Sequence, residues 1–203
     1  MSRTVSRPST ATAAVFLGVI AVFALVTIAL VTGGGGQSAV TVGTASVSRT
    51  DVDDELRVLA ESTALAKAVG AENVSVGKGS LLAEPATGIV SSIVQELLLR
   101  QYLDRVGEKV TATDYQNSIA LREGSAIGAV FATFPQWYRE RYSERLAVFA
   151  AFSRVTGATA DDQTAAQRII TREARRTPIE VEAEYGRYVP RQISVVPYTL
   201  PSD

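Results

Sequence analysis

The chain has 203 residues and a formal net charge of −1 at pH 7, and it contains neither cysteine nor histidine. Without these two residue types it has no disulfide, histidine general base, cysteine nucleophile, Ser-His-Asp triad or ordinary zinc site. The nearly balanced charge, with no basic stripe interleaved with aromatic residues, also argues against a general affinity for nucleic acid.

An uncharged apolar segment near the N-terminus is the most informative feature of the sequence. Residues 11–32 are almost wholly Ala, Val, Leu, Ile and Phe, and about 20 helical residues are enough to cross the hydrocarbon core of a bilayer. The sequence therefore predicts a transmembrane helix over 11–32. Arg3 and Arg7 precede it, and the next charged residue is Arg49, so residues 1–10 are expected in the cytoplasm. The predicted location is the cell membrane, with one span and the bulk of the chain extracytoplasmic.

The alternative is a secretory signal peptide, which also starts with basic residues but has a shorter apolar core of about 7 to 15 residues. Small residues over 43–46 offer candidate cleavage sites. The length of the apolar run favours an uncleaved anchor. Both alternatives export the same domain.

The folded domain is predicted over 39–203, after a flexible linker over 33–38 that contains four successive glycines. Val- and Thr-rich residues over 39–47 predict an initial strand with a turn at Gly43. A helix should follow, with Thr50 as its N-cap, and should run to Val69.

Residues 71–84 lack a clear hydrophobic period and predict a loop. Within it, Gly77 and Lys78 resemble part of a phosphate-binding loop. The required spacing fails on both sides, because Glu72 replaces the first glycine and Gly79 replaces the final Ser or Thr. No nucleotide or other cofactor is expected.

Four further helices are predicted from apolar spacing, capping residues and prolines. They cover Pro85 to Gly107, Thr113 to Glu123, Pro135 to Val155 and Ala160 to Arg176. After Pro178 the hydrophobic period changes to an alternation that predicts a strand over 179–185, and a last short strand is expected over 193–196. The predicted fold class is therefore mainly α: an N-terminal transmembrane helix, then a helical domain closed by short N- and C-terminal β-strands that pair with each other.

Two groups of acidic residues are candidates for a chemical site. Glu180, Glu182 and Glu184 would alternate on one strand face about 7 Å apart, which is too far for three of them to bind one ion, so a solvated face is favoured. The carboxylates of 53–55 lie in the first turn of a helix and suit its positive dipole end. We therefore predict no catalytic residue and no metal site, and do not expect an enzyme.

An aromatic set on the helix from Pro135 and just before it is the candidate binding surface. Adjacent residues on a helix point about 100° apart, so Trp137 and Tyr138 cannot share one narrow stripe. Two interpretations stay open: a packed core, or an exposed groove that holds apolar segments of a partner chain. The candidate residues are Phe134, Trp137, Tyr138, Tyr142, Phe149 and Phe152.

The order of these elements resembles the N-terminal domain of SurA-like extracytoplasmic chaperones. The resemblance is carried by the strand and helix cap over 42–51, the apolar helix over 89–107 with the capped helix behind it, the helix over 134–155, and the closing strand over 181–197. It implies an ATP-independent chaperone or foldase that shields unfolded exported chains. The parvulin-type prolyl isomerase domain of larger members has no room in this chain, so isomerase activity is not expected.

The sequence therefore predicts a membrane-anchored, extracytoplasmic chaperone-like domain that binds apolar and aromatic segments of exported proteins. The alternative is an accessory or structural subunit of a cell-envelope membrane complex. The expected partners are unfolded exported proteins or such a complex, and the membrane through residues 11–32.

Overall fold

The computed structural model describes residues 37–64, 75–77, 80–81, 83–123, 127–157 and 163–197. The helices are α2 (Arg49–Glu61), α4 (Ala83–Arg105), α5 (Ala112–Glu123), α6 (Gln136–Thr156) and α7 (Gln163–Ala174), with short 3-10 helices η1 (Gly128–Thr133) and η2 (Ala183–Tyr185). The strands are β1 (Ser38–Val42), β2 (Ala45–Ser48), β3 (Ser75–Gly77), β4 (Ser80–Leu81), β5 (Ile179–Val181), β6 (Arg187–Val189) and β7 (Ser194–Val196).

A three-stranded sheet joins the two ends of the described domain. β1 forms a hairpin with β2 through a turn at Gly43, whose φ of 62° suits glycine, and β1 also pairs antiparallel with β5. The strand order is therefore β2-β1-β5. Val40 pairs with Val181 across 141 positions of sequence, and the side chain of Val40 is fully buried. β5 thus makes the pairing predicted between strands at the two ends of the domain, whereas the last predicted strand, β7, pairs with β6 in a separate two-stranded sheet.

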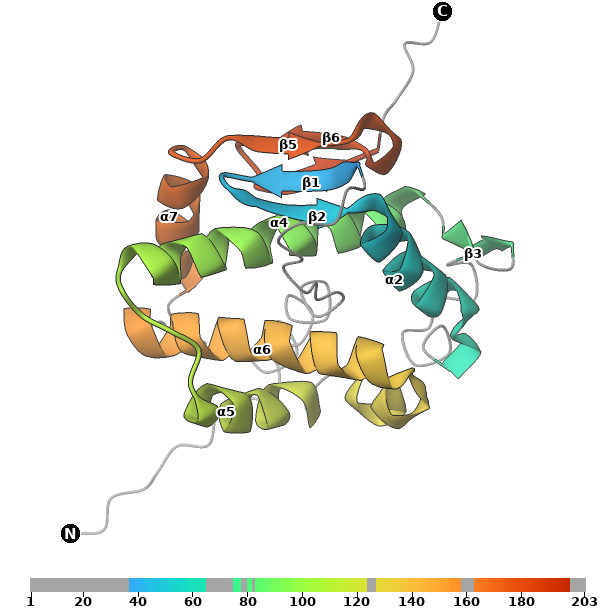
Figure 1. Cartoon of the computed structure of the whole chain (residues 1–203), viewed down its shortest axis with the longest axis horizontal. Coiled ribbons are helices and arrows are strands. Elements are labelled where there is room, and N and C mark those ends of the chain that lie inside the picture. The colour runs from blue at the N-terminus through green and yellow to red at the C-terminus, as the bar shows by residue number, and fades with distance from the viewer. Residues whose placement is uncertain are drawn as a thin grey trace, which may run out of the picture.

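The long helix α4 lies directly beneath the sheet (Figure 1). Most of its residues over 87–99 are buried, because the sheet, the C-terminal hairpin and the other helices cover it. The hairpin of β6 and β7 is held on it by side chains of α4: Ser91 Oγ accepts a hydrogen bond from the Val195 amide at 2.7 Å, and Gln95 Nε2 donates to the Ile193 carbonyl at 3.0 Å. The C-terminal strands are thus attached to the centre of the fold.

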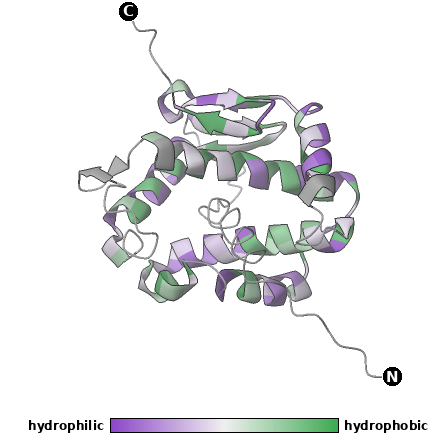
Figure 2. Cartoon of the chain, turned by 180° about the vertical axis from the view of Figure 1, so that it is seen from behind, coloured by the Kyte–Doolittle hydropathy of each residue, from purple (hydrophilic) through white to green (hydrophobic). Residues whose placement is uncertain are grey.

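Helix α6 runs below α4, and α5 packs on the far side of α6 (Figure 1). One hydrophobic cluster lies between the sheet, α2, α4 and the first half of α6, and a second lies between the C-terminal halves of α4 and α6 and helix α7. Figure 2 shows hydrophobic residues recurring along the strands and these two long helices. The two clusters make α4 and α6 the frame on which the shorter helices pack.

The predicted fold class needs correction. The described chain is mainly helical with short strands, but no helix in the described ranges is long and apolar enough to cross a membrane. The segment predicted to span the membrane, residues 11–32, lies outside the described residues, as do 1–10 and 33–36. The linker predicted over 33–38 overlaps the sheet, because Ser38 already belongs to β1.

Several element boundaries also differ from the sequence predictions. The helix predicted to run to Val69 is α2, which ends at Glu61 because the Ser62 amide bonds back to the Leu59 carbonyl in a tighter turn. Residues 65–69 lie outside the described part. The strand predicted over 179–185 ends at Val181, where the chain turns into η2. The predicted loop over 71–84 contains β3 and β4, which are too short to produce a detectable alternation.

Candidate functional site

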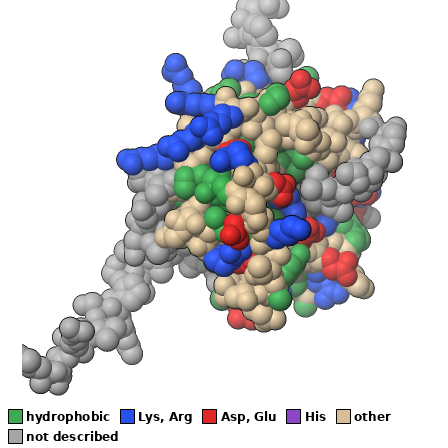
Figure 3. All heavy atoms as spheres, turned by 60° about the vertical axis from the view of Figure 1, so that its left-hand side comes forward, with side chains coloured by type: hydrophobic (Ala, Val, Ile, Leu, Met, Phe, Trp, Pro, Cys, Tyr) green, Lys and Arg blue, Asp and Glu red, His purple; other side chains and the backbone are tan. Residues whose placement is uncertain are grey.

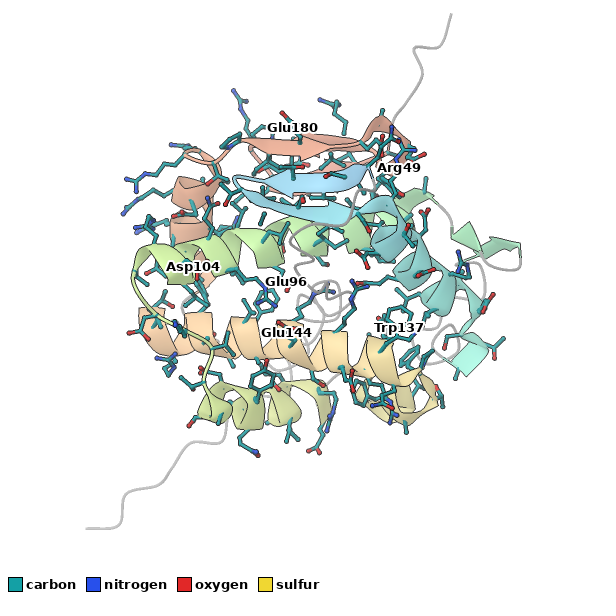
Figure 4. All side chains as sticks on the ribbon, viewed as in Figure 1. Arg49, Glu96, Asp104, Trp137, Glu144 and Glu180 are labelled. Atoms are coloured by element: carbon teal, nitrogen blue, oxygen red, sulfur yellow. The ribbon has the colours of Figure 1, made fainter. Side chains whose placement is uncertain are left out.

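The six predicted binding residues divide into an interior group and one exposed residue. Phe134, Tyr138, Tyr142 and Phe152 are buried, and Phe149 is half-buried against the second hydrophobic cluster. Trp137 is 38 % exposed, and it lies near the N-terminal end of α6 on the side of α2 (Figure 4). Of this set, Trp137 therefore presents the largest surface to a partner, whereas the four buried rings act as core.

The buried rings support Trp137 from behind. Its ring packs edge to face against Tyr138 with centroids 5.8 Å apart, and Tyr138 in turn contacts Phe134 at 4.9 Å. On another side, the guanidinium carbon of Arg141 lies 5.7 Å from the centroid of the Trp137 ring. Because these neighbours are packed, the tryptophan is fixed in place without being covered.

Two open depressions flank the outer edge of α6. The first has a volume of about 450 Å³ and lies between α2 and α6, where Trp137 forms part of its wall. The second has a volume of about 510 Å³ and lies between α6 and the pair formed by α5 and η1, with Tyr115 and Phe131 in its wall. Both share Glu140 and Glu144, which form the ridge between them.

Tyr115 is a binding candidate that sequence reasoning missed. It is 42 % exposed, and Ile119 on the next turn of α5 is 37 % exposed, whereas the polar residues Asp114 and Ser118 are buried. On this helix two polar residues are therefore buried while two large apolar residues are exposed, which departs from the usual amphipathic arrangement. The spacing of Tyr115 and Ile119 by four residues is visible in the sequence. Its outward direction is not, because buried polar residues on the same helix could not be foreseen.

The buried side chain of Asp114 forms hydrogen bonds both at the start of its own helix and with α6. Its side chain accepts hydrogen bonds from the amide and hydroxyl of Thr111 and from Arg154 of α6. Although burial raises the pKa of Asp114, the hydrogen bonds from Arg154 and Thr111 outweigh it and lower the pKa. These contacts fix α5 against α6, and so they position Tyr115 beside the second depression.

A network of ion pairs positions α2 and α6, which form the walls of the first depression. Arg141 of α6 contacts Asp51 of α2 at 2.7 Å and Glu55 at 3.5 Å. Behind this pair, Arg145 of α6 lies 3.2 Å from Glu96 of α4, and both side chains are essentially inaccessible to solvent. Arg100 then joins Glu96 to Glu144 at 2.9 and 2.8 Å. The ion pairs therefore connect α2, α4 and α6 directly beneath the ridge (Figure 4).

Burial dominates the electrostatics of this network. It raises the pKa of Glu55 well above its ordinary value, even though Arg145 and Arg141 oppose the shift. It also raises the pKa of Glu96 and lowers that of Arg145. Because the interior disfavours each charge, the network positions helices rather than offering groups to a ligand. Among the described residues no cluster of acidic side chains has the geometry of a metal site.

No protein-family model, no curated protein and no solved structure matches this chain. The site therefore consists of two open depressions, each with one exposed aromatic side chain, on either side of a helix that ion pairs and core packing attach to α2, α4 and α5.

Proposed function

We propose that this chain is an ATP-independent, chaperone-like domain that binds apolar and aromatic segments of exported polypeptides at the extracytoplasmic face of the cell membrane. The observation that carries the proposal is the pair of open depressions beside α6, with Trp137 in one and Tyr115 in the other. Residues 11–32 would attach the domain to the membrane, since their composition suits a bilayer interior.

The shape of the surface supports an extended chain as the ligand. A helix with its side chains is about 10 Å across, and an extended chain advances about 3.3 Å per residue. Two apolar residues four positions apart point to the same side of an extended chain and lie about 13 Å from each other, so such a segment would reach both depressions across α6. The carboxylates of Glu140 and Glu144, on the ridge between them, would accept hydrogen bonds from the amides of that segment.

The experiment uses the single tryptophan of the chain as its reporter. Trp137 is the sole tryptophan, so its fluorescence in the full-length protein reports on the first depression directly. A labelled peptide with leucine and phenylalanine four positions apart should change that fluorescence and gain anisotropy on binding. Trp137→Ala and Tyr115→Ala should each weaken peptide binding by roughly tenfold, because a buried aromatic contact contributes about 1 to 2 kcal/mol.

The matched control is Val106→Ala. Val106 is 40 % exposed and lines neither depression, so its replacement should leave binding of the peptide unchanged. Equal affinity of all three variants and the parent protein would contradict the proposed surface.

The alternative function is an accessory subunit of a cell-envelope membrane complex, and extraction in mild detergent separates the two. A chaperone should be recovered as a monomer with a varied set of exported proteins. One companion at fixed stoichiometry, covering Trp137 and abolishing its response to peptide, would favour the subunit instead. Protease digestion from outside intact cells tests the proposed location, because the domain over 39–203 should be cleaved there.

A further inference from the structure

A cluster of exposed arginines distinguishes the far end of the molecule from the proposed peptide surface. Arg168, Arg172 and Arg175 follow one another at intervals of four and three residues, which places them on one face of α7 and its final turn. Arg176 is exposed directly beside them. Figure 3 shows a group of basic side chains extending into solvent on this side of the molecule. We call these four residues the arginine face.

The arginine face carries positive charge that the described residues do not neutralise. None of its four members takes part in an ion pair within the described ranges. Glu173 lies on the same helix, but it is buried and paired with Arg105 of α4 at 2.7 Å. Asp104 at the end of α4 lies on the same side of the molecule (Figure 4) and offsets a single charge. Among the described residues, an excess of positive charge therefore remains on one helix face.

The connection of α7 to the sheet brings this face within reach of the start of the described chain. The Gly43 amide donates to the Pro178 carbonyl at 2.9 Å, so the end of α7 meets the Val42 end of β1. The five residues of β1 span about 17 Å, and residues 33–37 add at most about 17 Å more. With residues 11–32 in a bilayer, the arginine face can therefore lie against the lipid headgroups. Its distance from the headgroup phosphates is then shorter than the Debye length of about 8 Å, so salt at physiological concentration does not screen the attraction.

We propose that the arginine face docks on the phosphate groups of anionic lipids and so fixes the orientation of the domain on the membrane. Arginine suits this role because its guanidinium group forms paired hydrogen bonds with phosphate oxygens. Docking leaves the proposed peptide surface free, because Trp137 and α7 lie at opposite ends of the fold (Figures 1 and 4). The inference rests on the membrane attachment through residues 11–32 proposed above, but it does not depend on peptide binding.

The test measures how closely α7 approaches the lipid. The full-length chain has no cysteine, so Gln167→Cys, next to the arginine face, accepts a single fluorescent label. Thr133→Cys at the end of η1 provides the reference position. Energy transfer to a headgroup-labelled lipid is then compared in nanodiscs of phosphatidylcholine alone and of phosphatidylcholine with phosphatidylglycerol. Transfer from position 167 should increase in the anionic discs and fall again at high salt, whereas transfer from position 133 should not increase.

Charge variants assign the effect to particular residues. Each basic residue near an anionic membrane contributes enough to change the ratio of docked to undocked domain about fivefold. Arg168→Gln with Arg172→Gln should therefore lower that ratio roughly 30-fold. Arg187→Gln with Arg191→Gln is the matched control, since it removes two exposed arginines from the β6–β7 hairpin and its loop, and it should leave the ratio nearly unchanged.

Three results would overturn the proposal: equal transfer in both kinds of disc, an equal loss for the two pairs of variants, or tighter binding of α7 to a single-stranded RNA oligonucleotide than to anionic discs. The last result would assign the arginine face to nucleic acid. Docking on anionic discs with no retention on neutral discs would support the arginine face and contradict attachment through residues 11–32, so the two proposals fail separately.

Discussion

Glu55 is an acidic residue that is buried in the interior, which its position in the sequence does not suggest. The sequence predicts that the carboxylates over 53–55 lie in the first turn of a helix and complement its dipole. Helix α2 begins at Arg49, however, so these residues lie in its second turn, and Asp51 is the acidic residue of the first turn. Glu55 nevertheless points into the interior and is fully buried, whereas Asp54 is paired with Arg57 at the surface. Neighbouring residues on one helix turn can thus have opposite environments, because the helix turns by about 100° per residue.

The first prediction is that Glu55→Gln becomes more stable than the parent protein as the pH rises. A carboxyl whose folded pKa is raised stabilises the fold below its ordinary pKa of 4.5, and this stabilisation is lost as the pH rises through the folded value. The glutamine variant carries no such penalty. Its free energy of unfolding should therefore match the parent near pH 4 and exceed it by about 1 kcal/mol or more near pH 8.

Urea denaturation across this pH range provides the measurement. Asp54→Asn is the control, since the side chain of Asp54 is 43 % exposed and lies on the same helix turn. If Glu55→Gln were clearly less stable than the parent near pH 8, the attraction of Glu55 to Arg145 and Arg141 would outweigh the burial of its charge, and the expected direction of the effect would be wrong.

At the scale of elements, the helix caps explain why boundaries differ slightly from prediction. The sequence predicts Thr50 and Thr113 as N-caps, whereas Ser48 caps α2 by accepting a hydrogen bond from the Asp51 amide, and Thr111 exchanges hydrogen bonds with Asp114 at the start of α5. In both cases a hydroxyl residue two positions earlier is used. The earlier residue has an aspartate three positions later, which completes a reciprocal cap.

The second prediction concerns two glycines with opposite roles. Gly186 follows η2 with a φ of 118°, and a Cβ atom there would approach the Val196 carbonyl oxygen to 2.6 Å. Gly186→Ala should therefore destabilise the fold by about 2 kcal/mol. Gly88 lies inside α4, and a Cβ atom there meets no atom within 4 Å. Gly88→Ala should stabilise the fold by about 1 kcal/mol, because alanine favours the helix.

Thermal unfolding followed by circular dichroism measures both variants, and each serves as the control for the other. Destabilisation by both substitutions to a similar extent would mean that α4 is more tightly packed at Gly88 than the structure indicates. No change at Gly186 would show that the turn adapts to a side chain.

At the scale of the whole molecule, the C-terminal segment closes the domain. β5 adds to β1, Tyr185 donates a hydrogen bond to Asp53 of α2 at 2.8 Å, and Arg49 at the start of α2 pairs with Glu182. The β6–β7 hairpin packs on α4. Residues more than 100 positions apart therefore cover the first hydrophobic cluster together. The helices beneath the sheet need this cover to keep their apolar side chains buried.

The third prediction is that a chain ended after Pro178 loses cooperative unfolding. Removing β5, β6 and β7 leaves β1 with an unpaired edge and exposes the apolar face of α4 beneath it. The unfolding transition should broaden or vanish, and a dye that binds exposed apolar surface should become fluorescent. A chain ended after Pro197 is the control, because it keeps every described strand. A sharp transition within a few degrees of the full-length protein in both chains would contradict this role.

The candidate site is predictable from the sequence in part. The aromatic pattern includes Trp137, which the structure leaves exposed. The same pattern gives no reason to rank Trp137 above four other candidates that are buried in the core: Phe134, Tyr138, Tyr142 and Phe152. The pattern does not single out Tyr115, and the balanced overall charge conceals the arginine face. Each of these differences concerns exposure or charge compensation, which depend on neighbours that are distant in sequence.

The sequence by itself excluded the chemistry that needs histidine or cysteine. It also determined the approximate positions of the helices and the strands at both ends of the domain. Hydrophobic period, capping and turn formation act over a few residues, so they can be recognised locally. The tertiary structure decided which aromatic residues face solvent and that Glu55 and Arg145 are buried. It also decided that Glu173 turns inward to Arg105, so that no described acidic side chain pairs with the arginine face. These features arise from contacts between elements brought together only by folding, because burial and ion pairing are properties of the packed molecule rather than of any segment.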